Sequence, residues 1–169
     1  MRRPARDVEH GTAPAWSPPA TASGGGRRRF LARVRGRLLR PVRRDAEGDP
    51  LQELHVSFHR QMAFIAKHPE VPRRLLGWLA HEVDTGNRRR VQKLVDRFTR
   101  RAAWIITRAQ RHGTVRPGID PEEAAIALVG AIQRLVRDAT AAPLRRRRFL
   151  LAASRTFAAF RRAWAGPPA

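Results

Sequence analysis

The segment Asn87–Gly113, with the sequence NRRRVQKLVDRFTRRAAWIITRAQRHG, decides the fold class of this chain. Its apolar residues recur three or four positions apart, which places them on one stripe of an α-helix, while arginines fill the opposite side. Gly113 is suited to end such a helix because glycine accepts a left-handed C-cap conformation. The pattern predicts a long amphipathic helix that must bury its stripe against other helices. The stripe consists of Val91, Leu94, Val95, Phe98, Ala102, Ile105, Ile106 and Ala109.

Asp-Pro pairs mark the beginnings of two other helices, at Asp49-Pro50 and at Asp120-Pro121. Aspartate accepts hydrogen bonds from the free N–H groups of a first turn, and proline suits the first helical position because it has no N–H. Between them, Pro72 opens a short apolar helix, which Thr85-Gly86-Asn87 is expected to end. No segment has the two-residue period of a strand, so we predict an all-α helical bundle of about five helices plus a short basic helix. The expected helices are 51–67, 73–83, 88–111, 121–138 and 144–164.

The N-terminal part of the chain has a different composition. Residues 1–26 are rich in proline and glycine and have no apolar period, so they are expected to be a disordered tail. Residues 27–44 are rich in arginine, with Phe30 and Val34 at helical spacing, and this predicts a short basic connector helix. A helical domain is expected to follow over residues 49–165.

The charge of the chain is strongly positive. Its 169 residues include 35 basic and 14 acidic side chains, for a net charge of +21, and only Lys67 and Lys93 are lysines. An arginine excess of this kind fits phosphate contact, because a guanidinium binds two phosphate oxygens at once. It also fits a GC-rich genome, which favours arginine codons, and we prefer this interpretation. Whatever its origin, the charge attracts polyanions.

Several classes of protein are excluded or disfavoured. The absence of cysteine excludes disulfides, thiol catalysis and thiolate zinc sites. The longest apolar run, Ala124–Ile132, is too short to span a membrane, and no secretory signal follows Arg2 and Arg3. We therefore expect a cytoplasmic protein without a membrane span.

The sequence gives little support for catalysis. His55 and His59 share a helix face four residues apart, a spacing that can hold a metal ion, but a third ligand is required and the pattern indicates none. There is no glycine-rich phosphate loop and no G-x-S-x-G motif. We expect no enzyme activity, no metal site and no cofactor.

Two arginine runs, Arg88–Arg90 and Arg145–Arg148, lie at expected helix starts. Positive charge at a helix N-terminus is unfavourable by roughly 0.3–1 kcal/mol, so stability does not explain these runs. They are either solvated or bind phosphate. The second option supports an alternative function, that of a non-specific nucleic-acid-binding basic protein acting through its arginine-rich segments.

The last two expected helices combine apolar stripes with small residues. Small side chains allow helices to approach closely, so this pair could join the same pair of a second copy in a four-helix interface. Packing within one chain is the alternative. The small residues are Ala124, Ala125, Gly130, Ala131, Ala152, Ala153 and Ala158.

Three segments resemble regulators of the tetracycline-repressor (TetR) family. In Phe64–Leu76, FIAKHPEVPRRLL, one helix ends at a His-Pro and the next begins at a Val-Pro, as in that family. Ala109–Ala125, AQRHGTVRPGIDPEEAA, is similar to the family's link into its dimerising helices, and Val129–Leu135 is similar to the segment after it. Their order and spacing extend the resemblance over a large part of the chain.

The resemblance implies a ligand-responsive transcriptional regulator that is a homodimer and whose repression a small molecule releases. It would make residues 49–165 the ligand-sensing and dimerisation domain, and 27–44 the connector to a DNA-binding head. That head is a three-helix module whose last helix enters the major groove, and residues 1–26 are not expected to supply it. The expected partners are a second copy of the chain and a small apolar or amphipathic effector, with DNA through the basic segments as a further candidate.

The effector pocket is expected among the helices 51–67, 73–83 and 88–111, whose inward positions mix aromatic, methionine and alanine side chains. The alternative is that these side chains form a solid core. The pocket candidates are Phe58, Met62, Trp78, Phe98, Ala102 and Ile105. The candidates for the dimer interface are Ala125, Leu128, Ile132, Leu135, Ala153, Phe157 and Phe160.

Overall fold

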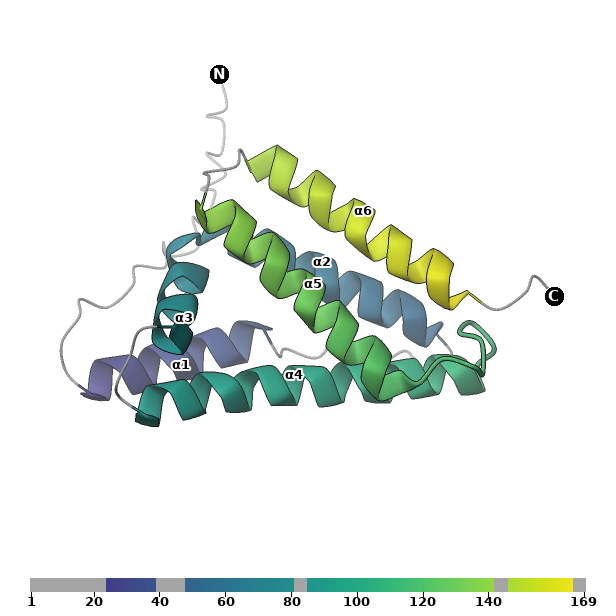
Figure 1. Ribbon diagram of the computed structural model, residues 1–169, viewed down its shortest axis with the longest axis horizontal. Coiled ribbons are helices and arrows are strands. Elements are labelled where there is room, and N and C mark those ends of the chain that lie inside the picture. Colours follow the sequence, from purple (N-terminus) through teal and green to yellow (C-terminus); the bar gives the residue numbers. More distant parts are fainter. Residues whose placement is uncertain (1–23, 39–47, 81–84, 142–145, 166–169) are drawn as a thin grey trace, which may run out of the picture.

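The computed structural model describes residues 24–38, 48–80, 85–141 and 146–165. These residues form six α-helices and no strand, apart from one isolated bridge between Val115 and Ala165, so the prediction of an all-α fold is confirmed (Figure 1). None of the described helices is both long and apolar enough to cross a lipid bilayer. The helices are α1 (Gly24–Leu38), α2 (Pro50–Lys67), α3 (Glu70–Ala80), α4 (Thr85–Arg111), α5 (Pro121–Ala141) and α6 (Arg146–Trp164).

Three helix beginnings differ from the sequence prediction. The glycines at 24–26, assigned to the tail, form the first turn of α1. Pro72 lies in the first turn of α3 and does not open it, which costs no hydrogen bond because first-turn N–H groups have no partner within the helix. Thr85–Asn87 begins α4, and the Asn87 side chain accepts a hydrogen bond from Arg90 at 3.1 Å. Residues 1–23 and 39–44 of the predicted tail and connector lie outside the described residues.

The helices are arranged around the long helix α4. It runs along one edge of the molecule, α5 crosses it, and α5 and α6 lie antiparallel beside each other (Figure 1). Helix α2 packs between α4 and α6, and the short helices α1 and α3 lie against the N-terminal half of α4. In this arrangement the single apolar stripe of α4 packs against several other helices of the chain.

The main core lies between α2, α4, α5 and α6. Its side chains come from the stripes that the sequence predicts, and Met62, Ile106 and Leu128 have no exposed surface. Burying one such side chain contributes roughly 1.5–3 kcal/mol, so this cluster dominates the stability of the fold. Its large members are Leu51, Leu54, Phe58, Met62, Ile105, Ile106, Leu128, Phe149, Phe157 and Trp164.

A second cluster joins α1 and α3 to α4. Phe30, Leu31 and Val34 of α1 pack there with Val71 of α3 and Val91 of α4. The apolar spacing that predicted an amphipathic basic helix therefore corresponds to a buried face. Helix α1 is held to the bundle by this face, and its charged residues remain outside.

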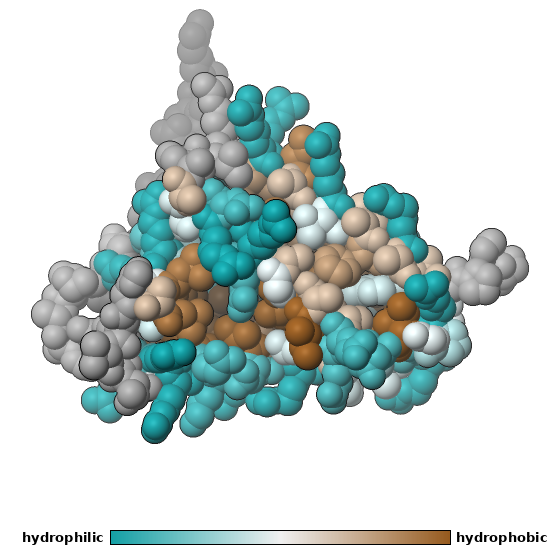
Figure 2. Space-filling model, in the orientation of Figure 1, coloured by the Kyte–Doolittle hydropathy of each residue, from teal (hydrophilic) through white to brown (hydrophobic). Residues whose placement is uncertain are grey.

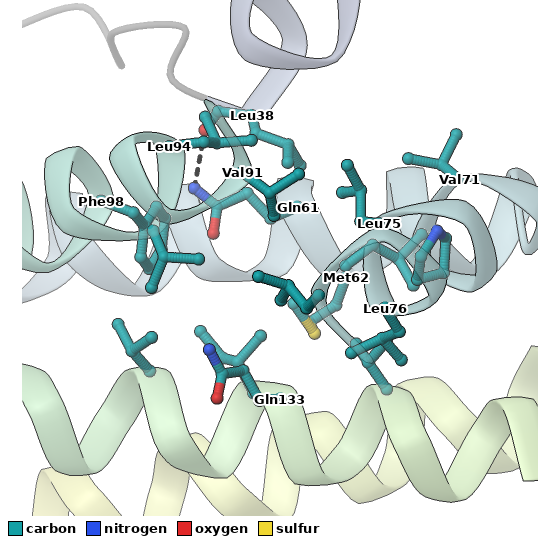
Figure 3. A pocket seen from close by; sticks show the side chains of 17 residues that line it. Leu38, Gln61, Met62, Val71, Leu75, Leu76, Val91, Leu94, Phe98 and Gln133 are labelled. Carbon is teal, nitrogen blue, oxygen red and sulfur yellow. Dashed lines mark hydrogen bonds between the residues drawn. The ribbon is translucent and has the colours of Figure 1, made fainter. Parts of the chain in front are cut away.

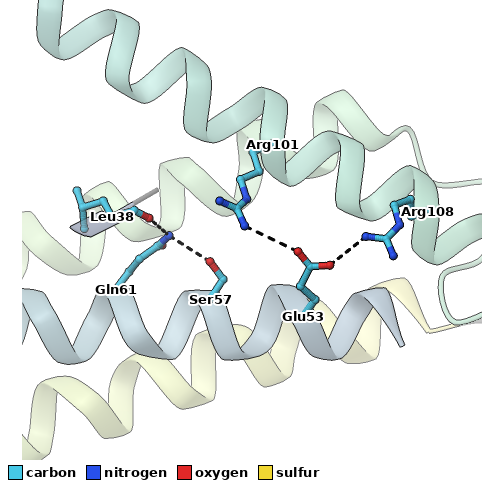
Figure 4. Close-up of polar contacts among 6 residues, drawn as sticks. All are labelled: Leu38, Glu53, Ser57, Gln61, Arg101 and Arg108. Carbon is cyan, nitrogen blue, oxygen red and sulfur yellow. Dashed lines mark hydrogen bonds and ion pairs between the residues drawn. The ribbon is translucent and has the colours of Figure 1, made fainter. Parts of the chain in front are cut away.

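A polar seam runs along the contact of α2 with α4. The Glu53 carboxylate forms ion pairs with Arg108 at 3.0 Å and with Arg101 at 3.8 Å. The Gln61 side chain donates a hydrogen bond to the Leu38 carbonyl oxygen at 2.8 Å (Figure 4). The carboxylate is largely shielded from water, so the two guanidinium groups offset its desolvation. The seam fixes the register of α2 against both α4 and the end of α1.

Asp49 and Asp120 cap their helices as predicted, but only Asp49 also bridges distant segments. Its carboxylate accepts from Leu51 N at 2.8 Å and from the Thr114 hydroxyl at 3.1 Å, in the loop after α4. Asp120 accepts from two first-turn N–H groups of α5 and from no other described residue. Gly113, with φ 80°, makes the left-handed turn that ends α4.

We predict that Asp49→Ala lowers the free energy of unfolding by about 1–2 kcal/mol, and Asp120→Ala by about 0.5–1 kcal/mol. The difference arises because Asp49 also accepts from Thr114. Thr114→Val removes this contact together with the hydroxyl's contact to the Ala109 carbonyl oxygen, so it should lower the free energy of unfolding by at least that difference. Urea unfolding followed by circular dichroism measures all three variants. Equal losses for the two aspartates would show that the link to Thr114 contributes nothing.

Candidate functional site

An apolar cavity of about 140 Å³ lies where α2, α3, α4 and α5 meet (Figure 3). It separates the two hydrophobic clusters, since Met62 belongs to the main core while Val71 and Val91 belong to the second cluster. Figure 2 shows hydrophobic side chains gathered in the angle between α3, α4 and α5. The cavity is therefore a gap between two packed regions of one bundle.

The wall of the cavity is almost entirely apolar. Of the described residues that line it, Gln61 of α2 and Gln133 of α5 are the two with polar side chains, and none is charged. Such a wall binds an uncharged apolar molecule, because a charge without a partner is costly to remove from water. The apolar wall consists of Leu38, Met62, Ile65, Val71, Pro72, Leu75, Leu76, Leu79, Val91, Leu94, Val95, Phe98, Val129, Ile132 and Val136.

The orientation of the Gln61 amide is fixed by its neighbours. A carbonyl oxygen can only accept, so the amide nitrogen must face Leu38, and the same nitrogen lies 3.4 Å from the Ser57 hydroxyl. The amide oxygen of Gln61 then points toward the cavity, across from Gln133 (Figure 3). The site thus offers a hydrogen-bond acceptor on one wall and a complete amide on the other.

Two of the six predicted pocket residues, Met62 and Phe98, line this cavity. Phe58, Ala102 and Ile105 do not line it; each is at most 2% exposed and packs within the main core. The structure therefore places these three side chains in the packed core beside the cavity.

The fourth residue that does not line the cavity is Trp78. Its ring packs edge-on against Phe30 of α1, with the ring centres 5.6 Å apart. It therefore belongs to the contact that holds α1 and not to the cavity wall.

Gln61 and the α5 side of the cavity were missed by the sequence analysis. Gln61 falls between Phe58 and Ile65 on the apolar stripe of α2, and a polar residue at such a position indicates either a buried partner or a site. No comparable polar position in the apolar stripe indicated that α5 would line the cavity. Ile132 was assigned to the dimer interface, yet it points into the cavity together with Val129 and Val136.

Comparison with known proteins identifies the family. The family model described as the C-terminal domain of SbtR-like transcriptional regulators matches residues 49–154, more than half of the chain. The chain belongs to this family. The resemblance to TetR regulators is thereby confirmed, and with it a role in the regulation of transcription. No curated protein and no solved structure matches the chain.

The structure places most of the interface residues predicted for this regulator inside the chain. Ala125, Leu128, Ala153 and Phe157 are at most 1% exposed, because α5 and α6 turn their apolar stripes inward against α2 and α4. A side chain buried within its own chain has no surface left for a second subunit. Leu135 and Phe160 are partly buried against the same core.

The outward faces of α5 and α6 in this regulator carry two large apolar side chains. Ile126 is 62% exposed and Leu151 51% exposed, the largest apolar side chains on the outside of these two helices. Small and charged side chains both lie around them, and Figure 2 shows a mixed pale, brown and teal surface over α5 and α6. The exposed small residues are Ala127, Gly130, Ala159 and Ala163.

The two histidines of α2 form an aromatic group with α6. The His55 and His59 ring centres are 4.5 Å apart, and His55 lies 4.9 Å from Phe157. The Nδ1 atom of His55 is buried and has no hydrogen-bond partner. Among the described residues no three His, Asp or Glu side chains come close enough together to hold a metal ion.

We predict that acid destabilises this regulator through His55. Burial, then the nearby His59, then Arg161 lower the pKa of His55 from its usual 6.5, so the unfolded chain takes up the proton more readily. The stability contribution is complete above pH 6.5 and is lost as the pH falls toward the lowered pKa. Unfolding midpoints measured across this range should fall with pH, and less so in His55→Leu.

The matched control is His112→Gln, on an exposed histidine that follows α4. This variant should keep the wild-type dependence on pH. If His55→Leu and His112→Gln behave alike, His55 is not the group responsible.

Proposed function

We propose that this chain is a ligand-responsive regulator subunit whose effector binds in the cavity between α2, α3, α4 and α5. The observation that carries the proposal is an apolar wall that, among the described residues, is interrupted by the amides of Gln61 and Gln133 alone. A core under selection for stability alone is packed without such gaps, because unfilled volume loses dispersion contacts. A maintained cavity with two amides is better suited to binding.

The dimensions of the cavity favour a compact effector. Its volume of about 140 Å³ is close to that of an engineered aliphatic cavity that binds benzene, about 150 Å³. A molecule with a single ring or a short chain fits without rearrangement. A hydroxyl or amide N–H on the effector would donate to the Gln61 oxygen, so we infer uncharged phenols, short alcohols or amides as the class.

The same residues suggest how binding would reach the rest of the chain. Leu38, the last described residue of α1, lines the cavity and accepts the hydrogen bond of Gln61. An effector that donates to the Gln61 oxygen would reorient this amide and so change its contact with Leu38. Helix α1 would then shift relative to α2, and α1 leads toward the N-terminal part of the chain.

The test compares two phenylalanine substitutions on α4. Val95→Phe places its ring in the cavity, so the fold should remain stable while ligand binding is lost. Ala102→Phe, two turns away, enters the packed main core and should cost about 1–3 kcal/mol. Thermal shift in the presence of phenols and short-chain alcohols measures both effects, because a bound ligand raises the melting temperature.

Two outcomes would contradict the cavity assignment. One is a Val95→Phe variant as destabilised as Ala102→Phe, which would mean that no usable space exists. The other is an equal ligand-induced shift in the wild type and in Val95→Phe, which would place binding elsewhere.

We also propose a homodimer that forms through the outward faces of α5 and α6. Support comes from the exposed Ile126 and Leu151 and from the small residues around them, which allow helices of two copies to approach closely. A stable dimer of ordinary size buries about 800 Å² on each partner. Two adjacent antiparallel helices of this length supply a surface of that order.

We predict that Ile126→Arg with Leu151→Arg converts the dimer to a monomer, because each copy would bury two new charges without partners. The control is Gln52→Arg with Gln92→Arg, which adds the same charge at exposed positions of α2 and α4. Sedimentation at micromolar concentration distinguishes the species. A monomeric wild type, or a dimeric double arginine variant, would refute this interface.

A further inference from the structure

A row of cations follows the face of α4 that is turned away from both cores. Its first four members recur three or four positions apart, the fifth follows about three turns later, and all are exposed, so they fall on one line along the helix. From the first to the last the line extends about 32 Å at 1.5 Å per residue. Figure 2 shows the corresponding edge as a continuous hydrophilic band, and Figure 1 shows no helix below it. The row consists of Arg90, Lys93, Arg97, Arg100 and Arg111.

At one end of this row, a groove lies between α4 and α1. Arg28 and Arg35 of α1 face the cations of α4 across a gap of about 250 Å³. The floor of the groove is apolar, formed by Leu31, Ala32 and Leu94. Among the residues that the structure describes, no acidic side chain lines the groove, so both of its rims carry positive charge.

The acids near α4 do not neutralise the row. Asp96, the one acid within α4, accepts from Gln92 at 3.0 Å, and Glu53 is occupied by Arg101 and Arg108. None of the five cations of the row forms an ion pair with a described residue. Their charge is available to a partner.

An aromatic side chain interrupts the row. Trp104 is 42% exposed and lies on the same face, between Arg100 and Arg111. The Arg108 guanidinium lies 4.8 Å from the centre of its ring, which leaves the indole positioned at the surface by its neighbour. A large apolar ring within a charged band suits a partner that is both anionic and planar.

We propose that the outer face of α4, with the groove beside α1, binds single-stranded nucleic acid. The phosphates follow the cation row, and a base stacks on Trp104, as aromatic side chains stack bases in sequence-independent binders. A duplex would keep its base faces inside and gain nothing from Trp104, and an acidic peptide lacks the repeated planar rings. The proposal depends on neither the effector cavity nor the dimer.

The experiment measures the affinity of the full chain for a labelled oligothymidine of about 20 nucleotides, and for a duplex of the same length, by fluorescence anisotropy. The salt concentration is varied from about 50 to 200 mM. The test variant Lys93→Gln, Arg97→Gln, Arg100→Gln is compared with Arg60→Gln, Arg73→Gln, Arg116→Gln, which removes the same charge from scattered exposed positions. Apart from its three substitutions, each variant keeps all the arginines of the wild type.

The row variant should flatten the slope of log affinity against log salt by about 2, since each phosphate contact with a single strand contributes about 0.7. The scattered variant should change the slope much less. Trp104→Leu should weaken single-strand binding roughly tenfold with the slope and the duplex affinity unchanged, and Trp104→Phe should retain most of the binding.

Three results would overturn the proposal. Equal losses of affinity in the row variant and the scattered variant would show that binding depends on net charge and not on this face. A Trp104→Leu chain that melts like the wild type and binds oligothymidine equally well would show that no base stacks on Trp104. Polyglutamate of equal charge binding as tightly as oligothymidine would make the face a site for acidic proteins.

Discussion

The apolar stripe of α4 is the contact on which the rest of the structure depends. Its N-terminal part holds α1 and α3 through Val91, and its C-terminal part enters the main core through Ala102 and Ile106. Cations then have to occupy the other face, where each like-charged neighbour costs about 0.2–0.5 kcal/mol. A single buried isoleucine contributes roughly 1.5–3 kcal/mol, so burial outweighs the repulsion along the helix.

The cavity follows from the same division. Because α4 serves two clusters, a stretch between them, at Val95 and Phe98, faces neither cluster closely. Gln61 lies at this point since the carbonyl of Leu38 ends α1 and needs a donor that the helix itself does not provide. One amide therefore satisfies a helix terminus and faces the empty volume, which places the chemistry of the cavity next to a structural joint.

The sequence predicted the helices better than the site, and the reason is physical. Caps such as Asp49 and Gly113 are local signals, so they determine where helices begin and end. Periodicity shows which side chains face inward, but whether they meet solid packing or a gap depends on how far the helices diverge. Phe98 and Ala102 share one stripe, yet only Phe98 reaches the cavity. The exposed faces of α5 and α6 carry mostly charged residues with a few small ones, so they gave no apolar stripe to detect.

Leu94 connects the two surfaces that this structure offers for binding. Its side chain lines the effector cavity on one side and the floor of the basic groove on the other. Helix α1 is shared in the same way, since Leu38 borders the cavity while Arg28 and Arg35 form a rim of the groove. If an effector at Gln61 shifts α1, as proposed above, the distance between these arginines and the cations of α4 changes with it. The proposed cavity and the groove would then be coupled through α1.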